Sequence, residues 1–206
     1  MATRFYRWTS GGLWQRILSA LHEMADAVGQ IDWSVHHVDS TTIRAHQHAA
    51  GARGGQHRQA LGRSRGGFST KLHIRCEGYG RPMVFVLSGG ERHDATAVDD
   101  LLAGARVKRS GPGRPRHRPE AVVGDRGYSS HATRRSLRRR GIRPIIPQKR
   151  NEHPAYLMDW SRYRERNRIE RLVNRLKQYR RIATRYDKTA ASYAAFVALA
   201  ALRMWL

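Results

Sequence analysis

The hydrophobic residues of this chain follow two periods, one typical of helices and the other of strands. Apolar side chains recur at helical spacing over residues 11–29, whereas short β-branched or alternating runs occupy the middle of the chain. The expected elements are, in chain order, a helix over 11–29, a strand over 34–40, hairpin strands over 68–76 and 83–87, a helix over 94–102, a strand over 121–125, an arginine-rich helix capped by Ser129 or Ser130, a strand over 142–146, and helices over 163–177 and 189–206. This order predicts an α/β fold in which a ribonuclease H-like mixed sheet is flanked by helices.

The helix predicted over 163–177 carries three stripes of different character. One stripe holds Tyr163, Arg166, Glu170 and Lys177; a second is apolar and holds Ile169, Leu172, Val173 and Leu176; a third is basic and holds Arg164, Arg168, Arg171 and Arg175. Because the apolar stripe must face a core, Glu170 is expected at the border of a buried surface with cations close by. Metal-dependent chemistry on nucleic acid needs such a carboxylate, although a surface helix with ion pairs four residues apart explains this helix alone equally well.

Charge adds a second indication of function. Lys and Arg number 39 against 16 Asp and Glu, which gives a net charge of +23. This excess is larger than solubility requires and predicts a polyanionic partner, most simply DNA or RNA. Two basic segments with few large apolar side chains, near 45–67 and 106–119, are expected to be mobile loops whose cations, including Arg65, can reach a phosphate backbone.

Cysteine content and the apolar runs exclude several other classes. Cys76 is the single cysteine, so the chain has no disulfide framework and no thiolate zinc cluster. The first residues lack the apolar core of a signal peptide, and the apolar run over 190–202 is too short to span a bilayer. We therefore expect a soluble intracellular protein without a membrane partner.

Three acidic residues are distinguished by their position. Asp39 and Asp125 each end a predicted strand, and Glu170 lies on the predicted helix over 163–177. Two aspartates at the ends of neighbouring strands and a glutamate from a helix can surround a pair of Mg²⁺ or Mn²⁺ ions, which prefer carboxylate oxygens. Two such ions can activate an attacking oxygen and stabilise a leaving one in phosphodiester chemistry.

Spacing alone leaves other assignments open, because 16 acidic residues offer many triples. Asp94, Asp99 and Asp100 are explained by capping and solvation, with Asp94 as the N-cap of the helix over 94–102. A metal site built from histidines is the weaker alternative, because no cysteine and no helical histidine pair supports one; its candidates are His36, His37, His46 and His48.

The four residues of the first stripe are spaced as Tyr, two residues, Arg, three residues, Glu, six residues, Lys. In this spacing the chain resembles the bacterial insertion-sequence transposases with an Asp-Asp-Glu (DDE) catalytic triad. The blocks VDSTTIRAH around Asp39, LGRSRGGFSTKLH before the predicted hairpin and GDRGY around Asp125 also resemble the family, as does the C-terminal stretch from Arg181. The resemblance covers roughly residues 34–206.

The resemblance implies a function and a set of roles. Asp39, Asp125 and Glu170 would be catalytic and would bind two Mg²⁺ or Mn²⁺ ions. Water would cut a strand at the end of the element, and the freed 3′-OH would attack target DNA. The residues expected to contact DNA are Tyr163, Arg166, Lys177, Arg126 and Arg65. The partners would be transposon ends and target DNA, bound by a homo-oligomer in a synaptic complex at the bacterial nucleoid in the cytoplasm.

The chain also departs from the family pattern. Arg126 stands where the second aspartate block commonly has lysine. Residues 1–33 resemble only a helical remnant of the segment that recognises element ends, ahead of a DDE catalytic domain over 34–206. The chain therefore resembles a second-frame product whose partner would be an upstream-frame DNA-binding segment. Two alternatives follow, a truncated non-catalytic DNA-binding regulator of transposition and a ribonuclease H-like nuclease without strand transfer.

Overall fold

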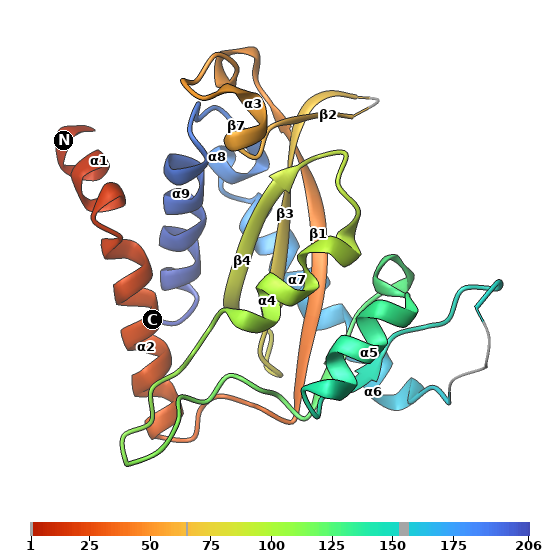
Figure 1. The fold of residues 1–206 in the computed structure, drawn as a ribbon. Helices are drawn as coiled ribbons and strands as arrows, with labels where there is room; N and C mark the ends of the chain where they lie inside the picture. Colours follow the sequence, from red (N-terminus) through yellow and green to blue (C-terminus); the bar gives the residue numbers. More distant parts are fainter. Residues whose placement is uncertain (1, 65, 153–156) are drawn as a thin grey trace.

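In the computed structural model, strand β1 (Val35–Ala45) lies at the centre of a seven-stranded mixed sheet (Figure 1). Along one edge β1 pairs antiparallel with β3 (Gly67–Cys76), whose hairpin partner is β4 (Pro82–Gly89). Along the other edge β1 pairs in parallel with β5 (Ala121–Val123), and β5 pairs in parallel with β6 (Arg143–Ile145). The predicted α/β class, a ribonuclease H-like mixed sheet flanked by helices, is confirmed.

Helices cover both faces of the sheet. Helices α4 (Val98–Ala103) and α5 (His131–Arg139) lie on one face, α7 (Asn167–Lys177) and α9 (Ala190–Arg203) lie on the other, and α2 (Leu13–Ala27) packs against α9 (Figure 1). The shorter elements are α1 (Ala2–Ser10), η1 (Gln47–Ala49), α3 (Gly55–Arg58), β2 (Gly62–Ser64), η2 (Asp94–Ala97), η3 (Arg126–Tyr128), α6 (Trp160–Arg164), α8 (Arg180–Ala183) and β7 (Thr184–Arg185). The structure describes residues 2–64, 66–152 and 157–206, and no helix within them is long and apolar enough to cross a membrane.

Strand β1 is longer than β5 and β7, the two strands that pair with it on this edge, and a gap remains in the sheet between them. β5 pairs with residues 35–37 of β1, and β7 pairs only with Arg44 and Ala45. Between these pairings, residues 38–43 meet no strand on this edge among the residues that the structure describes. Asp39 lies in this gap, where side chains from the loop after β5 and from the start of α7 can approach it.

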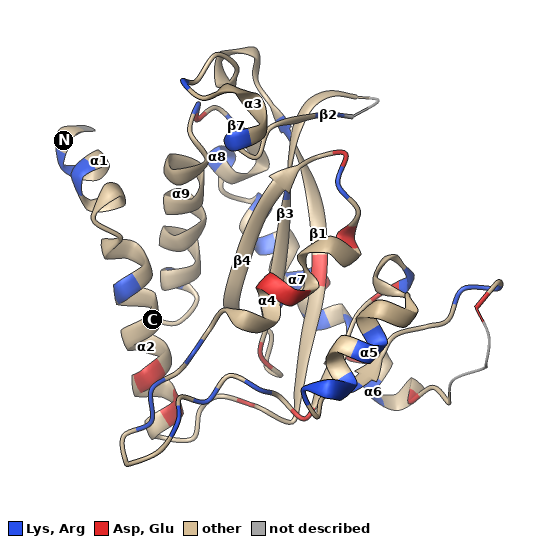
Figure 2. Ribbon diagram, viewed as in Figure 1, with Lys and Arg blue, Asp and Glu red and all other residues tan. Residues whose placement is uncertain are grey.

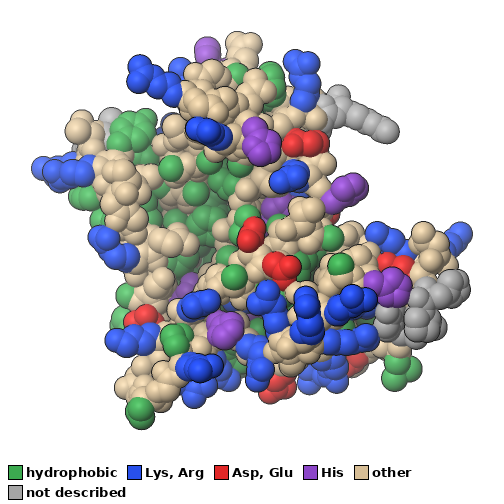
Figure 3. Space-filling view, viewed as in Figure 1, with side chains coloured by type: hydrophobic (Ala, Val, Ile, Leu, Met, Phe, Trp, Pro, Cys, Tyr) green, Lys and Arg blue, Asp and Glu red, His purple; other side chains and the backbone are tan. Residues whose placement is uncertain are grey.

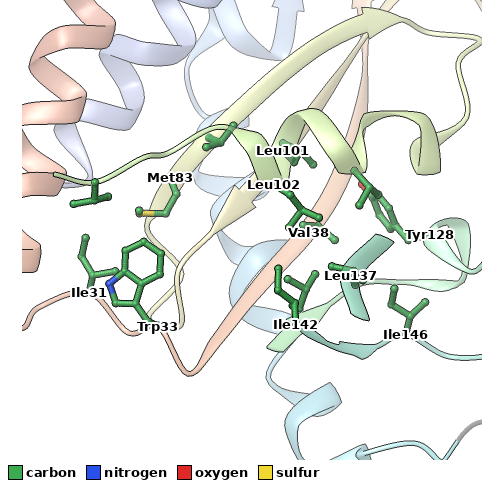
Figure 4. Close-up of a cluster of buried hydrophobic side chains, with 14 of the residues drawn as sticks. Ile31, Trp33, Val38, Met83, Leu101, Leu102, Tyr128, Leu137, Ile142 and Ile146 are labelled. Carbon is green, nitrogen blue, oxygen red and sulfur yellow. The ribbon is translucent and has the colours of Figure 1, made fainter. Parts of the chain in front are cut away.

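Two hydrophobic clusters hold the helices on the sheet. The first lies against α4 and α5 and includes Ile31, Trp33, Val38, Met83, Leu101, Leu102, Tyr128, Leu137, Ile142 and Ile146 (Figure 4). The second lies beneath α7 and α9 and includes Ile43, Leu72, Ile74, Ile169, Leu172, Leu176, Tyr193 and Val197. The apolar stripe predicted within 163–177 therefore faces the core, and burying each such aliphatic side chain stabilises the fold by about 1.5–3 kcal/mol.

The helix predicted over 163–177 is interrupted, and the prediction of one continuous helix is wrong at this point. Helix α6 ends and α7 begins on either side of Glu165 and Arg166. The backbone N–H groups of Arg166 and Arg168 each bond the carbonyl three residues earlier, at 3.0 and 2.9 Å, which is the tighter 3₁₀ pattern. The break places Arg166 at the start of α7, beside the gap in the sheet.

Two further boundaries differ from expectation. Strand β1 continues to Ala45 instead of ending near residue 40, because residues 41–43 keep the strand alternation and pair with β3. The segment over 45–67, expected to be a loop throughout, contains η1, α3 and β2. Arg185 helps to hold this segment in place, because its buried guanidinium donates a hydrogen bond to the carbonyl of Ala60 at 3.2 Å.

A buried histidine joins α2 to the sheet. The Nε2 atom of His22 lies 3.3 Å from the carbonyl oxygen of Pro82, and its ring meets the indole of Trp205 edge-on. Burial lowers the pKa of His22 to about 4, although the Pro82 carbonyl opposes this shift. The ring is therefore neutral at pH 7 and donates its Nε2 proton to the carbonyl.

This histidine should make the fold sensitive to acid. The unfolded chain binds a proton at His22 near pH 6.5 and the folded chain only near pH 4, so the free energy of unfolding should fall as the pH drops through this window. The His22 share should reach on the order of 3 kcal/mol at its lower end. Denaturant titrations of wild type and His22→Leu between pH 7 and 4 should show a shallower pH dependence in the variant, and His57→Leu at an exposed site serves as control. Equal pH dependence in all three proteins would contradict this role for His22.

Candidate active site

The candidate site lies at the gap beside β1. Asp39 projects from β1 with its side chain only 15% exposed. Asp125 follows β5 after one residue, and its side chain caps η3 by accepting a hydrogen bond from the Gly127 N–H at 2.8 Å. Arg166 and Glu170 approach from the first turn of α7, because the break after α6 points this turn toward the strand.

Arg166 joins the strand to the helix. Its Nη2 lies 3.2 Å from Oδ2 of Asp39, and its Nη1 bonds Oε1 of Glu170. Asp39 and Arg166 are largely buried, whereas the Glu170 side chain is half exposed. One guanidinium thus brings together two of the three acids that the sequence singled out, although they are 131 residues apart (170 − 39).

The pKa shifts reflect this crowding of charge. Burial raises the pKa of Asp39 above its ordinary value, Arg166 opposes the rise, and the carboxylates of Asp125 and Glu170 add to it. Burial alone would lower the pKa of Arg166, but the nearby carboxylates, Asp39 first among them, outweigh it, so that this pKa is raised. Asp125 and Glu170 are therefore close enough to Asp39 to disfavour its charged form, and Arg166 stabilises that charged form.

Asp125 faces the same space without joining this ion pair. It lines a cleft of about 330 Å³ together with Arg126, Pro147, Trp160, Tyr163 and Arg166. Among the described residues, no three His, Cys, Asp or Glu side chains are gathered tightly enough to hold one ion. The cation between Asp39 and Glu170 is instead a guanidinium, which shows that a positive charge fits between these two carboxylates.

The other predicted DNA contacts lie at different distances from this cleft. Tyr163 lines it, packs on a small cluster at β5 and β6, and meets the Trp160 ring edge-on at 5.7 Å. Arg126 is exposed at the rim. Lys177 is exposed at the C-terminal end of α7, seven residues and so about 10 Å along the helix from Glu170. Arg65 lies outside the described residues.

The structure adds Asp94, whose interpretation as a helix cap is wrong. His93 occupies the N-cap position of η2, while Asp94 Oδ1 accepts a hydrogen bond from Ser40 Oγ at 2.7 Å and pairs with Lys71 Nζ at 3.0 Å. These contacts lower the pKa of Asp94, although burial alone would raise it. Because Ser40 follows Asp39, this pair fixes the strand beside the candidate site. The sequence carries no signal for the contact, since Ser40 and Asp94 are 54 residues apart.

The histidine alternative finds no support. His36 and His37 are fully buried on opposite faces of β1, and burial lowers the pKa of both, which keeps the rings neutral. The His36 ring stacks on Trp33 at 5.0 Å. His46 and His48 lie against each other at η1, and the described residues hold no cluster of metal-binding side chains there.

Comparisons with known proteins identify the family to which this chain belongs. Residues 34–205 match the family described as Transposase DDE domain. The chain is 36% identical over 130 residues to a Burkholderia cepacia protein named as a transposase for insertion sequence element IS402, which covers 63% of this chain and 59% of that protein. It is 32% identical over 142 residues to a Brucella ovis protein named as a transposase for insertion sequence element IS6501, which covers 67% of this chain and 98% of that protein. The chain therefore belongs to the family of DDE transposases.

Proposed function

We propose that this chain cuts DNA at the ends of an insertion sequence and joins the freed 3′ ends to target DNA. Asp39, Asp125 and Glu170 would be its catalytic residues. The observation that carries the proposal is the Arg166 guanidinium held between the carboxylates of Asp39 and Glu170 at the gap in the sheet. Family membership supports a reaction on DNA, and the names of the two relatives support an insertion sequence as its substrate.

Divalent cations suit this donor set. Transposases of this family generally use divalent metals, and carboxylate oxygens are the ligands that Mg²⁺ and Mn²⁺ prefer. Asp39 and Glu170 already share a cation, and Asp125 is near enough to raise the pKa of Asp39. Two ions held by Asp39, Asp125 and Glu170 would activate the attacking oxygen and stabilise the leaving one.

The reaction needs no protein nucleophile. In the first step the oxygen of water bonds to phosphorus, the bond from phosphorus to O3′ breaks, and a proton passes from the water to the leaving oxygen. The products are a 3′-OH and a 5′-phosphate. In the second step this 3′-OH bonds to a phosphorus of target DNA, and the target strand leaves with its own 3′-OH. The chain's contribution is to align these oxygens and to neutralise charge on the phosphate.

Arg166 would change partners during this cycle. Once cations neutralise Asp39 and Glu170, its guanidinium can bind a phosphate oxygen beside the scissile bond. Arg126 lies in the same cleft and offers a second guanidinium to the same strand. Tyr163 presents its ring at the wall of the cleft, and Lys177 would contact a phosphate farther along.

Cationic surfaces beside the cleft support a path for the flanking duplex. Lys and Arg positions are frequent along α5 and along the segment that precedes β5 (Figure 2), and basic side chains gather on this face of the molecule (Figure 3). The exposed members are Arg106, Lys108, Arg109, Arg114, Arg116, Arg118, Arg135, Arg138 and Arg139. We infer that this surface, which includes the predicted basic loop over 106–119, and the basic segment over 45–67 hold DNA on either side of the cut.

The arrangement of the whole protein follows from the same proposal. Residues 34–206 would form the catalytic domain, with residues 1–33 as a helical segment that adjoins it. An upstream-frame segment would recognise the element ends, either fused to this chain or bound to it. The active form would be a homo-oligomer that pairs two transposon ends at the nucleoid in the bacterial cytoplasm.

Removing one carboxylate should separate chemistry from binding. In a strand-transfer assay with a pre-cut end duplex, a supercoiled plasmid and Mg²⁺ or Mn²⁺, Glu170→Gln should lower joined product at least about 100-fold, because the variant loses a metal ligand. Its affinity for DNA in EDTA should stay within about twofold of wild type. Glu165→Gln, which breaks only an ion pair with Arg168 one turn away, should retain activity. Equal loss of binding and joining in Glu170→Gln would contradict a catalytic role.

Asp94 should act on the reaction through Asp39. Asp94→Ala removes the acceptor of Ser40 and the partner of Lys71, so the strand that carries Asp39 loses its support. We expect the maximal cleavage rate to fall about tenfold with an unchanged DNA dissociation constant, and a higher Mn²⁺ concentration should recover part of the loss. Asp100→Ala, at an exposed position of α4, is the matched control. A loss of thermal stability without any shift in the Mn²⁺ requirement would show that Asp94 only supports the fold.

A further inference from the structure

A groove lies on the side of α7 that faces away from the candidate active site. It has a volume of about 620 Å³ and is lined by Tyr79, Arg168, Arg171, Asn174, Arg175 and Gln178. One wall is α7 and the other is the turn between β3 and β4. Arg171 and Arg175 are about 100° and 140° around α7 from Glu170, so this groove and the catalytic cleft are on different faces of one helix.

The turn between β3 and β4 is held against α7 by hydrogen bonds, so the shape of the groove is fixed by the fold. Arg168 donates to the carbonyl of Gly78, and Arg175 Nη2 donates to the carbonyl of Gly80 at 3.4 Å. Gly80 has a φ of +86°, and a Cβ there would lie 3.3 Å from the backbone oxygen of Arg168. Glycine is therefore required at this close approach. Between the two glycines the Tyr79 side chain stays 65% exposed at the mouth of the groove.

The charge of the groove is uncompensated. Arg168 pairs with Glu165 at 3.2 Å, but within the described part of the chain no carboxylate lies in ion-pair range of Arg171 or Arg175. Both arginines are exposed, and the amides of Asn174 and Gln178 lie on the same helical face. An open groove with two guanidiniums that have no carboxylate partner, two amides and one phenol ring is suited to a ligand that carries repeated negative charge.

We propose that this groove binds the phosphodiester backbone of a second DNA segment, apart from the strand that enters the catalytic cleft. Arg171 and Arg175 are four residues apart and so rise about 6 Å along the helix, which suits neighbouring phosphates of one strand. Asn174 and Gln178 add hydrogen bonds to phosphate or sugar oxygens, and the Tyr79 ring packs on a deoxyribose or an unstacked base at the end of the groove. An acidic peptide would match the charge but would leave no role for the ring and the amides together.

Alkylation of an introduced thiol tests the site directly. The natural thiol, Cys76, is fully buried, and burial raises its pKa, so it should not react. An Asn174→Cys variant therefore carries its reactive thiol inside the groove, whereas Ser19→Cys carries it on the exposed side of α2. We expect a saturating duplex in EDTA to slow iodoacetamide labelling at position 174 about tenfold and to leave position 19 unchanged. Equal rates with and without DNA at position 174 would overturn the proposal.

The source of the DNA is distinguished by the duplex that is added. A duplex from an element end and an unrelated duplex should protect position 174 equally, because backbone contacts carry no sequence information. Protection by the end duplex alone would overturn the backbone assignment. Since EDTA prevents cleavage, the result is independent of whether the three acids catalyse the proposed chemistry.

Salt dependence gives a second, independent measure. Removing two phosphate contacts in Arg171→Ala/Arg175→Ala should reduce the slope of log K against log salt by about two and weaken binding about tenfold at low salt. The control Arg4→Ala/Arg7→Ala removes the same charge from exposed positions on α1 and should change the slope by much less. If both double variants lose the same slope, the groove arginines act only through overall charge and the proposal is wrong.

Discussion

Strand β1 is paired on its β5 edge only near its two ends, at residues 35–37 and 44–45, and the candidate site depends on the gap between them. A longer β5 would cover Asp39 with another strand and leave no room for side chains from elsewhere. The unpaired stretch is tolerated because β3 pairs along the whole of it and keeps β1 extended. Arg166 then fills the gap, and its bonds to Asp39 and Glu170 join the start of α7 to the strand. The sheet supplies rigidity and the gap supplies access, so the same strand can hold a carboxylate firmly and still present it to a substrate.

The basic residues fall into two groups, those that form an ion pair with an acidic residue and those that do not. Several acidic side chains each form an ion pair with one particular cation, as Glu77 does with Arg81 and Asp26 with Arg116. With 39 basic residues against 16 acidic ones, many cations are left without such partners. Surface pairs add little stability, so this surplus costs some self-repulsion and has no structural explanation in the isolated chain. A polyanion that binds over α5 and around α7 would relieve that repulsion. DNA binding would therefore account for the excess of basic residues.

The sequence was sufficient for the order of the main elements along the chain and for the three acids as candidates, because both depend on local patterns. An alternating run predicted β3, a continuous apolar run predicted β4, and an apolar stripe predicted the buried face of α7. What it could not predict depends on contacts between distant segments. The break before Asn167 is accompanied by a contact between Arg166 and Asp39, which are 127 residues apart, and Asp94 is held by a serine 54 residues away. The burial of Arg75 could not be predicted either. Its guanidinium donates to the carbonyls of Gly104 and His117, which lie next to it only in the folded chain.

Helix α7 explains how one short element can serve two sites. The residues of its apolar stripe, Ile169, Leu172 and Leu176, are buried against the sheet. Their burial fixes the rotation of the helix about its own axis. With the rotation fixed, Glu170 must emerge on one side of the core and Arg171 and Arg175 on the other. The two sides cannot turn independently, so a DNA segment held in the groove would set the orientation of a second segment in the cleft. A rigid angle between two bound DNA segments is what a reaction that joins one DNA end to another molecule requires, and here it would follow from the 3.6-residue period of a single helix.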